Sequence, residues 1–302
     1  MRLIKTVKSL IKRLLIDHCP QLIIEHEWPG VTGHKIDWNN PKDLNEKIQW
    51  LTCFSDTTEW SRLTDKLLVR DYLREKGFES LLPKLYGYWE NADSINVEEL
   101  PEKFVLKCNH DSGSTIIVDK SKGFDWLSIK SFLNQKLNRK FGYVGCEPHY
   151  NRIKPLIIAE EYLEPSAREI AISSSIVDYK VWCFNGEPFC TWTCHNRTNE
   201  CAEVNVYDMD WRVHPECSVF NDHYRDGKGV IPKPESFGNM MKAASILSEG
   251  FPQVRVDFYE VGGKLYFGEM TFTSLAGRMD FYTEAFLKEM GDKVVLPNKK
   301  CK

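Results

Sequence analysis

The sequence lacks several patterns that would place it in a common class of protein. No run approaches the roughly 20 apolar residues that a membrane-spanning helix needs, and the apolar runs near the N-terminus are too short and interrupted for a signal peptide. Internal repeats and low-complexity tracts are absent. The cysteines contain no CxxC pair, the spacing of zinc and redox sites. Five of the ten are instead flanked by strand-like apolar residues, which favours buried thiols and a cytoplasmic protein.

Common catalytic and nucleic-acid signatures are also missing. There is no GxxxxGK[ST] phosphate loop and no arrangement of Ser, His and Asp or of Cys and His that indicates covalent catalysis. The net charge is only −3, so no overall positive field favours a nucleic-acid partner. With 302 residues, 42% of them hydrophobic, the chain can bury a large core in two or three lobes.

The order of elements predicts an α+β protein. Helical patterns dominate the first hundred residues, while strand patterns outnumber them later. This distribution suggests a protein of more than one lobe.

The stretch 254–273, VRVDFYEVGGKLYFGEMTFT, predicts a β-hairpin around Gly262-Gly263. A two-residue Gly-Gly loop would turn Glu269 away from Asp257. A three-residue loop, which pairs Val261 with Leu265, sets Asp257 opposite Glu269. Only the second register gives one apolar and one polar face, so we expect it.

In that register Arg255 faces Thr271 and the two carboxylates face each other. Opposed carboxylates repel unless a cation lies between them, and Mg²⁺ is the usual cation of an all-oxygen site. An exposed polar face with a chance pair of acids is the alternative.

Lys107 ends a predicted strand and leads into a loop with Ser112, Gly113 and Ser114. An ammonium group beside a Gly/Ser loop suits phosphate, because glycine lets backbone N–H groups approach oxyanions.

Further polar residues follow predicted strands. Glu160, Glu161 and Leu163 end the run LIIAEEYLE, where a carboxylate and a backbone N–H can hold adenine; a solvated strand end is the alternative. Lys180 projects from an apolar strand, and an ion pair with Asp178 is the plain explanation for it.

Two other clusters invite a functional reading. His195, Asn196 and Arg197 follow a strand and can hold an anionic substrate, although a lone His is more often structural. Asp208 and Asp210 form a DxD triplet, the spacing with which glycosyltransferases hold a metal and a nucleotide diphosphate. A simple turn also explains the triplet.

Residues 1–17 predict a basic amphipathic helix. Its apolar stripe is made of Leu3, Ile4, Val7, Leu10, Ile11, Leu14 and Leu15. Two outcomes are open: the stripe contacts the inner membrane peripherally, or it packs on the protein's own core.

The ordered motifs resemble the TupA-like branch of the ATP-grasp superfamily, associated with teichuronopeptide and capsular polysaccharide gene clusters. The resemblance covers roughly residues 36 to 297 and rests on NPKDLNEKIQWL, LTDKLLVRDYL, FVLKCNHDSGSTIIV, AEEYL, DYKVWCFNG, YDMDW and FGEMTFTSLAG. It implies an ATP-grasp fold of three regions. These are a helix-rich N-terminal region at 1–64, a small mobile α+β lid at 65–160 and a catalytic lobe with an antiparallel sheet at 161–302.

The resemblance also implies roles for the residues in the motifs. ATP and Mg²⁺ would be bound. The nucleotide would be held by Lys66, Lys107, Ser112, Gly113, Ser114, Glu160, Glu161, Leu163 and Lys180, and the metal by Asp257, Glu269 and Thr271. Arg255 would stabilise the transferring phosphoryl group, and Lys180, near the ribose or phosphates, would also be catalytic. The family has Asn where Thr271 stands and an Arg-Pro-Gly pattern after it, for which Gly277-Arg278 substitutes here, with Arg278 as a catalytic residue.

The leading hypothesis is an ATP- and Mg²⁺-dependent carboxylate–amine ligase. It would join an amine or amino acid to a uronic-acid-containing polysaccharide, with an amino acid as the other candidate carboxylate. The alternatives are a glycosyltransferase that uses Asp208 and Asp210, and a non-catalytic scaffold held at the membrane by residues 1–17.

Overall fold

The computed structural model describes residues 2–299, so residues 1 and 300–302, at the ends of the predicted first and last regions, lie outside it. The α-helices are α1 (Arg2–His18), α2 (Pro20–Thr32), α3 (Leu44–Phe54), α4 (Thr58–Thr64), α5 (Val69–Glu75), α6 (Trp126–Leu137), α7 (Gly142–Gly145), α8 (Pro148–Asn151), α9 (Ala167–Ile172), α10 (Phe237–Ser248) and α11 (Glu284–Lys293). The strands are β1 (Leu85–Trp89), β2 (Lys103–Cys108), β3 (Ile116–Asp119), β4 (Ile157–Glu161), β5 (Asp178–Phe184), β6 (Glu187–His195), β7 (Ala202–Tyr207), β8 (Tyr224–Asp226), β9 (Val254–Val261) and β10 (Lys264–Thr271). The mixture confirms the α+β prediction.

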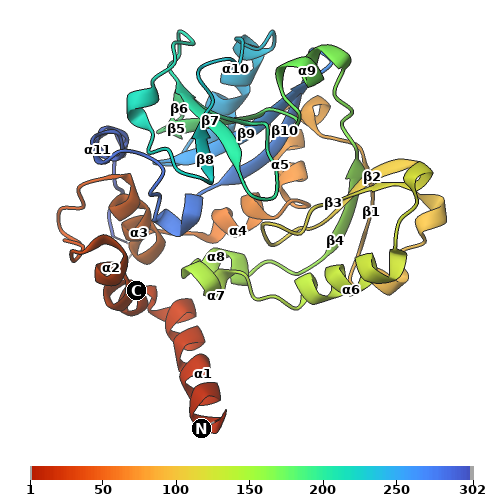
Figure 1. Ribbon diagram of the computed structural model, residues 1–302. Helices are drawn as coiled ribbons and strands as arrows, with labels where there is room; N and C mark the ends of the chain where they lie inside the picture. Colours follow the sequence, from red (N-terminus) through yellow and green to blue (C-terminus); the bar gives the residue numbers. More distant parts are fainter. Residues whose placement is uncertain (1, 300–302) are drawn as a thin grey trace.

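The strands form two separate sheets (Figure 1). The smaller sheet has the order β1-β4-β2-β3, and all its neighbours are antiparallel. In β2 the side chains of Phe104, Leu106 and Cys108 are fully buried and alternate with Lys107 and other less buried residues. This alternation lets the sheet pack one face against α6 while Lys107 points from the other face.

The larger sheet has the order β10-β9-β5-β6-β7-β8 and is antiparallel except between β7 and β8. Every residue of β5 is buried, as expected for a central strand that is covered on both faces. Helix α10 packs against β5, β6 and β9. The core of this lobe also takes in Trp182, Phe258 and Phe272, which are almost completely buried.

The hairpin of β9 and β10 corrects the predicted loop. Val261 pairs with Lys264, so the loop has two residues, and the predicted pairing of Val261 with Leu265 is wrong. Gly262 and Gly263 both have positive φ, which a two-residue hairpin of this kind requires. The register then shifts between Phe267 and Glu269, where a β-bulge inserts one extra residue.

The bulge restores the predicted pairings at the polar end of the hairpin. Asp257 lies opposite Glu269, and Arg255 lies opposite Thr271. The sequence analysis therefore predicted the correct strand partners but assigned the extra residue to the wrong place. An extra residue is present, but it is Gly268 within β10 rather than a third loop residue.

The N-terminal helices lie on the lobe of the larger sheet, and α1 extends away from the body of the protein (Figure 1). Ile16 is fully buried near the end of α1, whereas Val7, Leu10, Ile11 and Leu14 are exposed. The side chains of Leu3 and Ile4 lie outside the described residues. Of the helices within residues 2–299, none has both the length and the apolar character to cross a membrane.

Candidate active site

Asp257 and Glu269 face each other at the edge of the larger sheet. Asp257 is only 1% exposed, whereas the Glu269 side chain is 39% exposed. The guanidinium of Arg255 contacts both: its Nη2 is 2.8 Å from Asp257 Oδ2 and 3.6 Å from Glu269 Oε1. The positive charge that makes the opposed carboxylates tolerable is therefore supplied by Arg255.

Arg255 is itself fixed by its neighbours. Its Nε donates to Asp257 Oδ1 at 2.7 Å, which completes a two-point pair with that carboxylate. It also donates to Ser274 Oγ at 2.9 Å and to Thr271 Oγ1 at 3.2 Å. Burial lowers the pKa of Arg255, but the Asp257 carboxylate outweighs burial and raises it. The guanidinium is therefore a permanent, pre-oriented charge.

Lys180 lies behind Asp257 on the neighbouring strand β5. Its Nζ is 2.7 Å from Asp257 Oδ2 and 3.1 Å from Asp178 Oδ2, which confirms the predicted pair with Asp178 and adds a second partner. Burial would raise the pKa of Asp257, but Arg255 and Lys180 hold it below its usual value. Asp178 also pairs with Arg197, whose Nη2 lies 3.0 Å from Asp178 Oδ2.

Lys66 reaches the site from the turn before α5. Asp65 shapes this turn by accepting from the backbone N–H groups of Leu67 and Leu68. The Lys66 Nζ donates to the Asp111 carbonyl at 2.6 Å and lies 4.0 Å from Glu269 Oε2. One lysine therefore spans from the loop of the smaller sheet to the carboxylates of the larger one.

The Ser/Gly loop after β2 is held by its own side chains. Ser114 Oγ donates to Asp111 at 2.5 Å and accepts from the Cys108 backbone N–H at 2.9 Å. The carbonyl of Gly113 accepts from Lys136. Ser112 is exposed and lines the same cavity as Lys66.

Glu160 is paired with two cations. Its carboxylate is 2.5 Å from Lys107 Nζ and 3.0 Å from Arg70 Nη1. Sequence reasoning missed Arg70, which belongs to an ordinary helical pattern in α5. Glu161 accepts from the Lys84 backbone N–H at 3.1 Å.

Two neighbouring cavities lie where the sheets meet. A cavity of about 450 Å³ brings together Lys66, Ser112, Arg255, Glu269, Thr271 and Arg278. A second space of about 10 Å³ is lined by residues that include Lys66, Lys107, Glu160 and Gly268. Lys180 is buried behind these walls and lines neither.

Glu147 also lines the larger cavity, and sequence reasoning did not find it. Burial raises its pKa to about 7, and the hydroxyl of Thr273, which donates to it at 2.5 Å, offsets burial only in part. The residue lies between two short helices, in the segment GCEPH. No periodic pattern marks that segment.

The DxD triplet forms a turn. Asp208 Oδ1 accepts from the backbone N–H groups of Asp210 and Arg212, and Oδ2 is 3.1 Å from His214. Asp210 pairs with the exposed Arg212. Since both carboxylates are engaged locally, the geometry favours the turn explanation.

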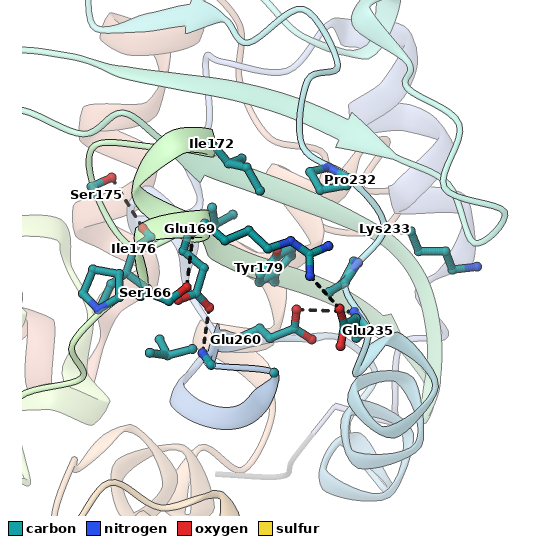
Figure 2. Close-up of a pocket in the computed structure, with 17 residues that line it drawn as sticks. Ser166, Glu169, Ile172, Ser175, Ile176, Tyr179, Pro232, Lys233, Glu235 and Glu260 are labelled. Atoms are coloured by element: carbon teal, nitrogen blue, oxygen red, sulfur yellow. Dashed lines mark hydrogen bonds and ion pairs between the residues drawn. The ribbon is translucent and has the colours of Figure 1, made fainter.

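Figure 2 shows a different cavity, of about 280 Å³, between α9, the hairpin loop and the segment before α10. Its acids bond to neighbouring groups: Glu169 accepts from Gly262 N–H at 2.7 Å, Glu260 accepts from Ser236 N–H at 2.7 Å, and Glu235 pairs with Arg168. None of the predicted site residues lines it. The hydrogen bonds of Glu169 and Glu260 thus connect α9 and the segment before α10 to the hairpin.

The two sheets, antiparallel except between β7 and β8, meet over the lysines, the Arg255 guanidinium and the paired carboxylates. This arrangement of sheets is the ATP-grasp fold. The model of the TupA-like ATP-grasp family matches residues 46–295, and the chain belongs to that family.

Solved structures of related fold are distant. D-alanine–D-alanine ligase from Bacillus anthracis is 15% identical, with a TM-score of 0.45, over 83% of this chain and 72% of that one. Its complex with ATP is 16% identical, with a TM-score of 0.43; the match covers 72% of this chain and spans only 57% of the ligase. A RimK domain ATP-grasp protein from Sphaerobacter thermophilus is 12% identical, with a TM-score of 0.39, over 77% of this chain and 67% of that one. Among curated proteins no relative matches.

Proposed function

We propose that the chain is an ATP-dependent carboxylate–amine ligase. The observation that carries the proposal is the Asp257–Glu269 pair, bridged by Arg255 on a cavity that Lys66 also reaches. Cationic side chains bind phosphate oxygens, and carboxylates bind the Mg²⁺ ion that accompanies ATP, so the two kinds of group together suit Mg²⁺–ATP. Family membership supports the same assignment.

The reaction has two balanced steps. A carboxylate oxygen of the substrate bonds to the γ-phosphorus of ATP, the bond from that phosphorus to the bridging oxygen breaks, and ADP leaves. The amine nitrogen then bonds to the acyl carbon, the carbon–oxygen bond to phosphate breaks, and the amine gives up one proton. Arg255 is oriented to offset charge on the transferring phosphoryl group, and Arg278 is available to hold the acyl phosphate in the same cavity.

The proposed metal ligands are Asp257, Glu269 and Thr271. Their donors are all oxygen, the kind that Mg²⁺ prefers, and Glu269 Oε1 accepts from the Thr271 hydroxyl at 3.3 Å. Both oxygens of the Asp257 carboxylate accept from Arg255 and Lys180, so Asp257 would hold a metal only after one of these contacts opens. In the described part of the chain no three His, Cys, Asp or Glu side chains are grouped closely enough to hold a metal. When bound, Mg²⁺ offsets charge on the phosphate oxygens.

The nucleotide would lie between the sheets. We assign Lys66, Lys107 and the Ser112–Ser114 loop to the phosphates, Glu160, Glu161 and Leu163 to adenine, and Lys180 to support of Asp257 near the phosphates. The space beside Lys107 and Glu160 is about 10 Å³, far smaller than an adenine ring. ATP binding therefore requires residues 65–160 to move as a lid away from the lobe 161–302, while 1–64 stays with the larger sheet.

The substrate assignment rests on the family context. We propose a uronic-acid carboxyl of a capsular or other surface polysaccharide, or an amino acid, as the carboxylate, with an amine or amino acid as acceptor. We propose a cytoplasmic location, because the synthesis of such precursors consumes ATP, and residues 1–17 can contact the inner membrane there. No nucleic-acid partner is involved.

Calorimetric titration with ATP, with and without MgCl₂, tests the proposal. ATP should bind the wild-type chain in the presence of MgCl₂, and Glu269→Gln should weaken binding by about tenfold, the loss of roughly one charge-assisted interaction. Glu187→Gln, an exposed residue on the same sheet, is the control. Unchanged ATP affinity in Glu269→Gln, or binding of UDP-glucose without binding of ATP, would refute the assignment.

A further inference from the structure

Helix α1 carries an apolar stripe that the rest of the protein does not cover. Val7, Leu10, Ile11 and Leu14 are exposed by 46%, 54%, 52% and 61%. Their spacing of three and four residues places them on one face of the helix. We call these four residues the α1 stripe.

The other side of α1 is fastened to the protein, so the helix is not free to turn its stripe inward. Lys12 pairs with Glu27 of α2 at 2.5 Å. Asp17 accepts from the Tyr143 hydroxyl at 2.6 Å and from Asn151 Nδ2 at 2.9 Å. Of the two outcomes open from the sequence, packing on the protein's own core therefore applies to the last turn, around the buried Ile16.

The charge on this segment selects the kind of surface that covers the stripe. Arg2, Lys5, Lys8, Lys12 and Arg13 are basic, and Asp17 is the first acid in the chain. Lys12, Arg13 and Asp17 contact the body of the protein; the Arg13 guanidinium lies over the ring of Tyr143, 5.3 Å from its centroid. A helix with exposed aliphatic side chains and basic neighbours is complementary to an anionic bilayer, whose interface offers both hydrocarbon and phosphate.

The C-terminal end of α1 lies close to the proposed active site. Tyr143 of α7 bonds to Asp17 of α1, and the next two residues, Val144 and Gly145, line the 450 Å³ cavity. Val144 is 62% exposed.

A series of ion pairs also joins α1 to the cavity wall. Lys12 contacts Glu27, and Glu27 Oε2 is 3.1 Å from Arg278 Nη2. Arg278 lines the cavity. The orientation of α1 is thus connected through Glu27 to a residue that we assign to the substrate.

We infer that α1 docks on the surface of an anionic lipid bilayer, with the α1 stripe in the interface. The helix lies on the membrane and does not span it. The inference rests on α1 and not on the ligase assignment.

Co-sedimentation of the full chain with vesicles tests the docking. Vesicles of phosphatidylcholine with phosphatidylglycerol should bind the wild-type chain, and vesicles of phosphatidylcholine alone should bind at least tenfold less. Binding should also weaken as salt is raised, since surface charges are screened. Equal binding to both vesicles, or none to either, would overturn the inference.

A pair of double variants separates the stripe from general hydrophobicity. Leu10→Ser with Leu14→Ser should lower partitioning to the anionic vesicles by about tenfold or more, because two apolar side chains no longer enter the interface. Ile117→Ser with Leu127→Ser is the control, since these residues are 60% and 75% exposed on the smaller lobe. Thermal melting checks that all variants are folded.

A second copy of the chain is the competing occupant of the stripe. Sedimentation equilibrium of the wild type and of the Leu10/Leu14 double variant decides between them. A monomeric wild type that binds anionic vesicles supports membrane docking. A dimer that the double variant dissociates, together with failure to bind vesicles, would overturn it.

Discussion

Asp257 faces Glu269 across β9 and β10 although only two residues, Gly262 and Gly263, join the strands. Counting from that loop, Asp257 should face Gly268, with Glu269 on the opposite side of the sheet. The bulge at Gly268 shifts the register by one residue, and a shift of one residue changes the face of every later side chain. The proposed metal site therefore depends on Gly268, a residue that contributes no side chain to it.

A side chain at Gly268 should disturb this geometry. A Cβ there would lie 3.0 Å from the Asp257 carbonyl oxygen and 3.1 Å from Tyr259 Cε2, so these neighbours must give by a few tenths of an ångström, and the larger side chain of valine crowds them further. We expect Gly268→Val to lower the free energy of unfolding by about 1–3 kcal/mol and to weaken ATP binding. Gly238→Ala in α10, where a Cβ meets nothing within 4 Å, is the control and should be neutral or slightly stabilising. Urea unfolding and calorimetry measure both; wild-type ATP affinity in Gly268→Val would contradict the argument.

Asp257 and Glu269 should respond differently to loss of charge. Asp257 is buried between Arg255 and Lys180, so Asp257→Asn leaves two buried cations with one acid fewer. Breaking a buried ion pair from one side costs about 3–5 kcal/mol. Glu269→Gln should change stability by less than about 1 kcal/mol, because its side chain is 39% exposed and solvent screens its contacts.

Unfolding in urea of both variants and the wild type measures this difference. Equal losses of stability in the two variants would show that Asp257 is not the buried partner of the two cations. The same data decide which variant is suitable for kinetics. Glu269→Gln can report on ATP binding in a folded protein, whereas Asp257→Asn confounds function with stability.

The sequence was sufficient to predict contacts within one hairpin. Alternation in VRVDFYEV places Arg255 and Asp257 on one face, and the requirement for one apolar and one polar face places Glu269 on the same side. The bulge was not predictable from the same pattern. Gly268 shows only that a bulge is allowed, and the polar face could equally be produced by a longer loop.

Contacts between distant segments were beyond the sequence. The pair of Lys180 with Asp178 lies within β5, but its shorter contact with Asp257 exists because β9 is the neighbour of β5 in the sheet. Arg70 and Glu160 are 90 residues apart and meet only when α5 packs beside the smaller sheet. Predicting such contacts requires knowledge of the strand order and of the helix packing, and local sequence patterns do not give either.

Glu147 should make stability depend on pH. Burial raises its pKa to about 7 from an ordinary value of 4.5, so between these values the folded state binds more protons than the unfolded state. Stability is therefore greatest below pH 4.5 as far as this group is concerned, falls as the pH rises through 7, and stays lower above it. A difference of about 2.5 in pKa corresponds to roughly 3 kcal/mol.

Glu147→Gln, which resembles the protonated acid, should remove the part of the pH dependence of stability that arises from Glu147. The free energy of unfolding of the variant, relative to wild type, should be higher at pH 8 than at pH 5 by about 2.5 kcal/mol, because a small part of the effect is already present at pH 5. Urea unfolding at the two pH values measures it, and Glu187→Gln should follow the wild type. Parallel pH dependence of Glu147→Gln and wild type would show that Glu147 is already ionised at pH 5.

Ala276 should be replaceable by glycine with a gain in stability. Leu275, Ala276 and Gly277 all have left-handed backbone conformations, with φ of 46°, 54° and 64°, and this segment lines the cavity. For a residue with a Cβ that conformation costs about 1–2 kcal/mol, whereas a new glycine adds about 0.5–1 kcal/mol of entropy to the unfolded chain. Relief of strain outweighs the added entropy of the unfolded chain, so Ala276→Gly should stabilise the protein by about 0.5–1 kcal/mol.

The matched control has the opposite sign. Ala285→Gly, at an exposed position in α11, should destabilise by about 0.5–1 kcal/mol because no strain is relieved there. Gln49 explains why the strain persists: its Nε2 donates to the carbonyls of Ala276 and Gly277 at 2.7 and 3.2 Å. If Ala276→Gly destabilises as much as Ala285→Gly, Gln49 does not hold a strained turn. If it stabilises, the cavity wall retains a conformation that its own sequence disfavours, as expected where a site is pre-formed for a ligand.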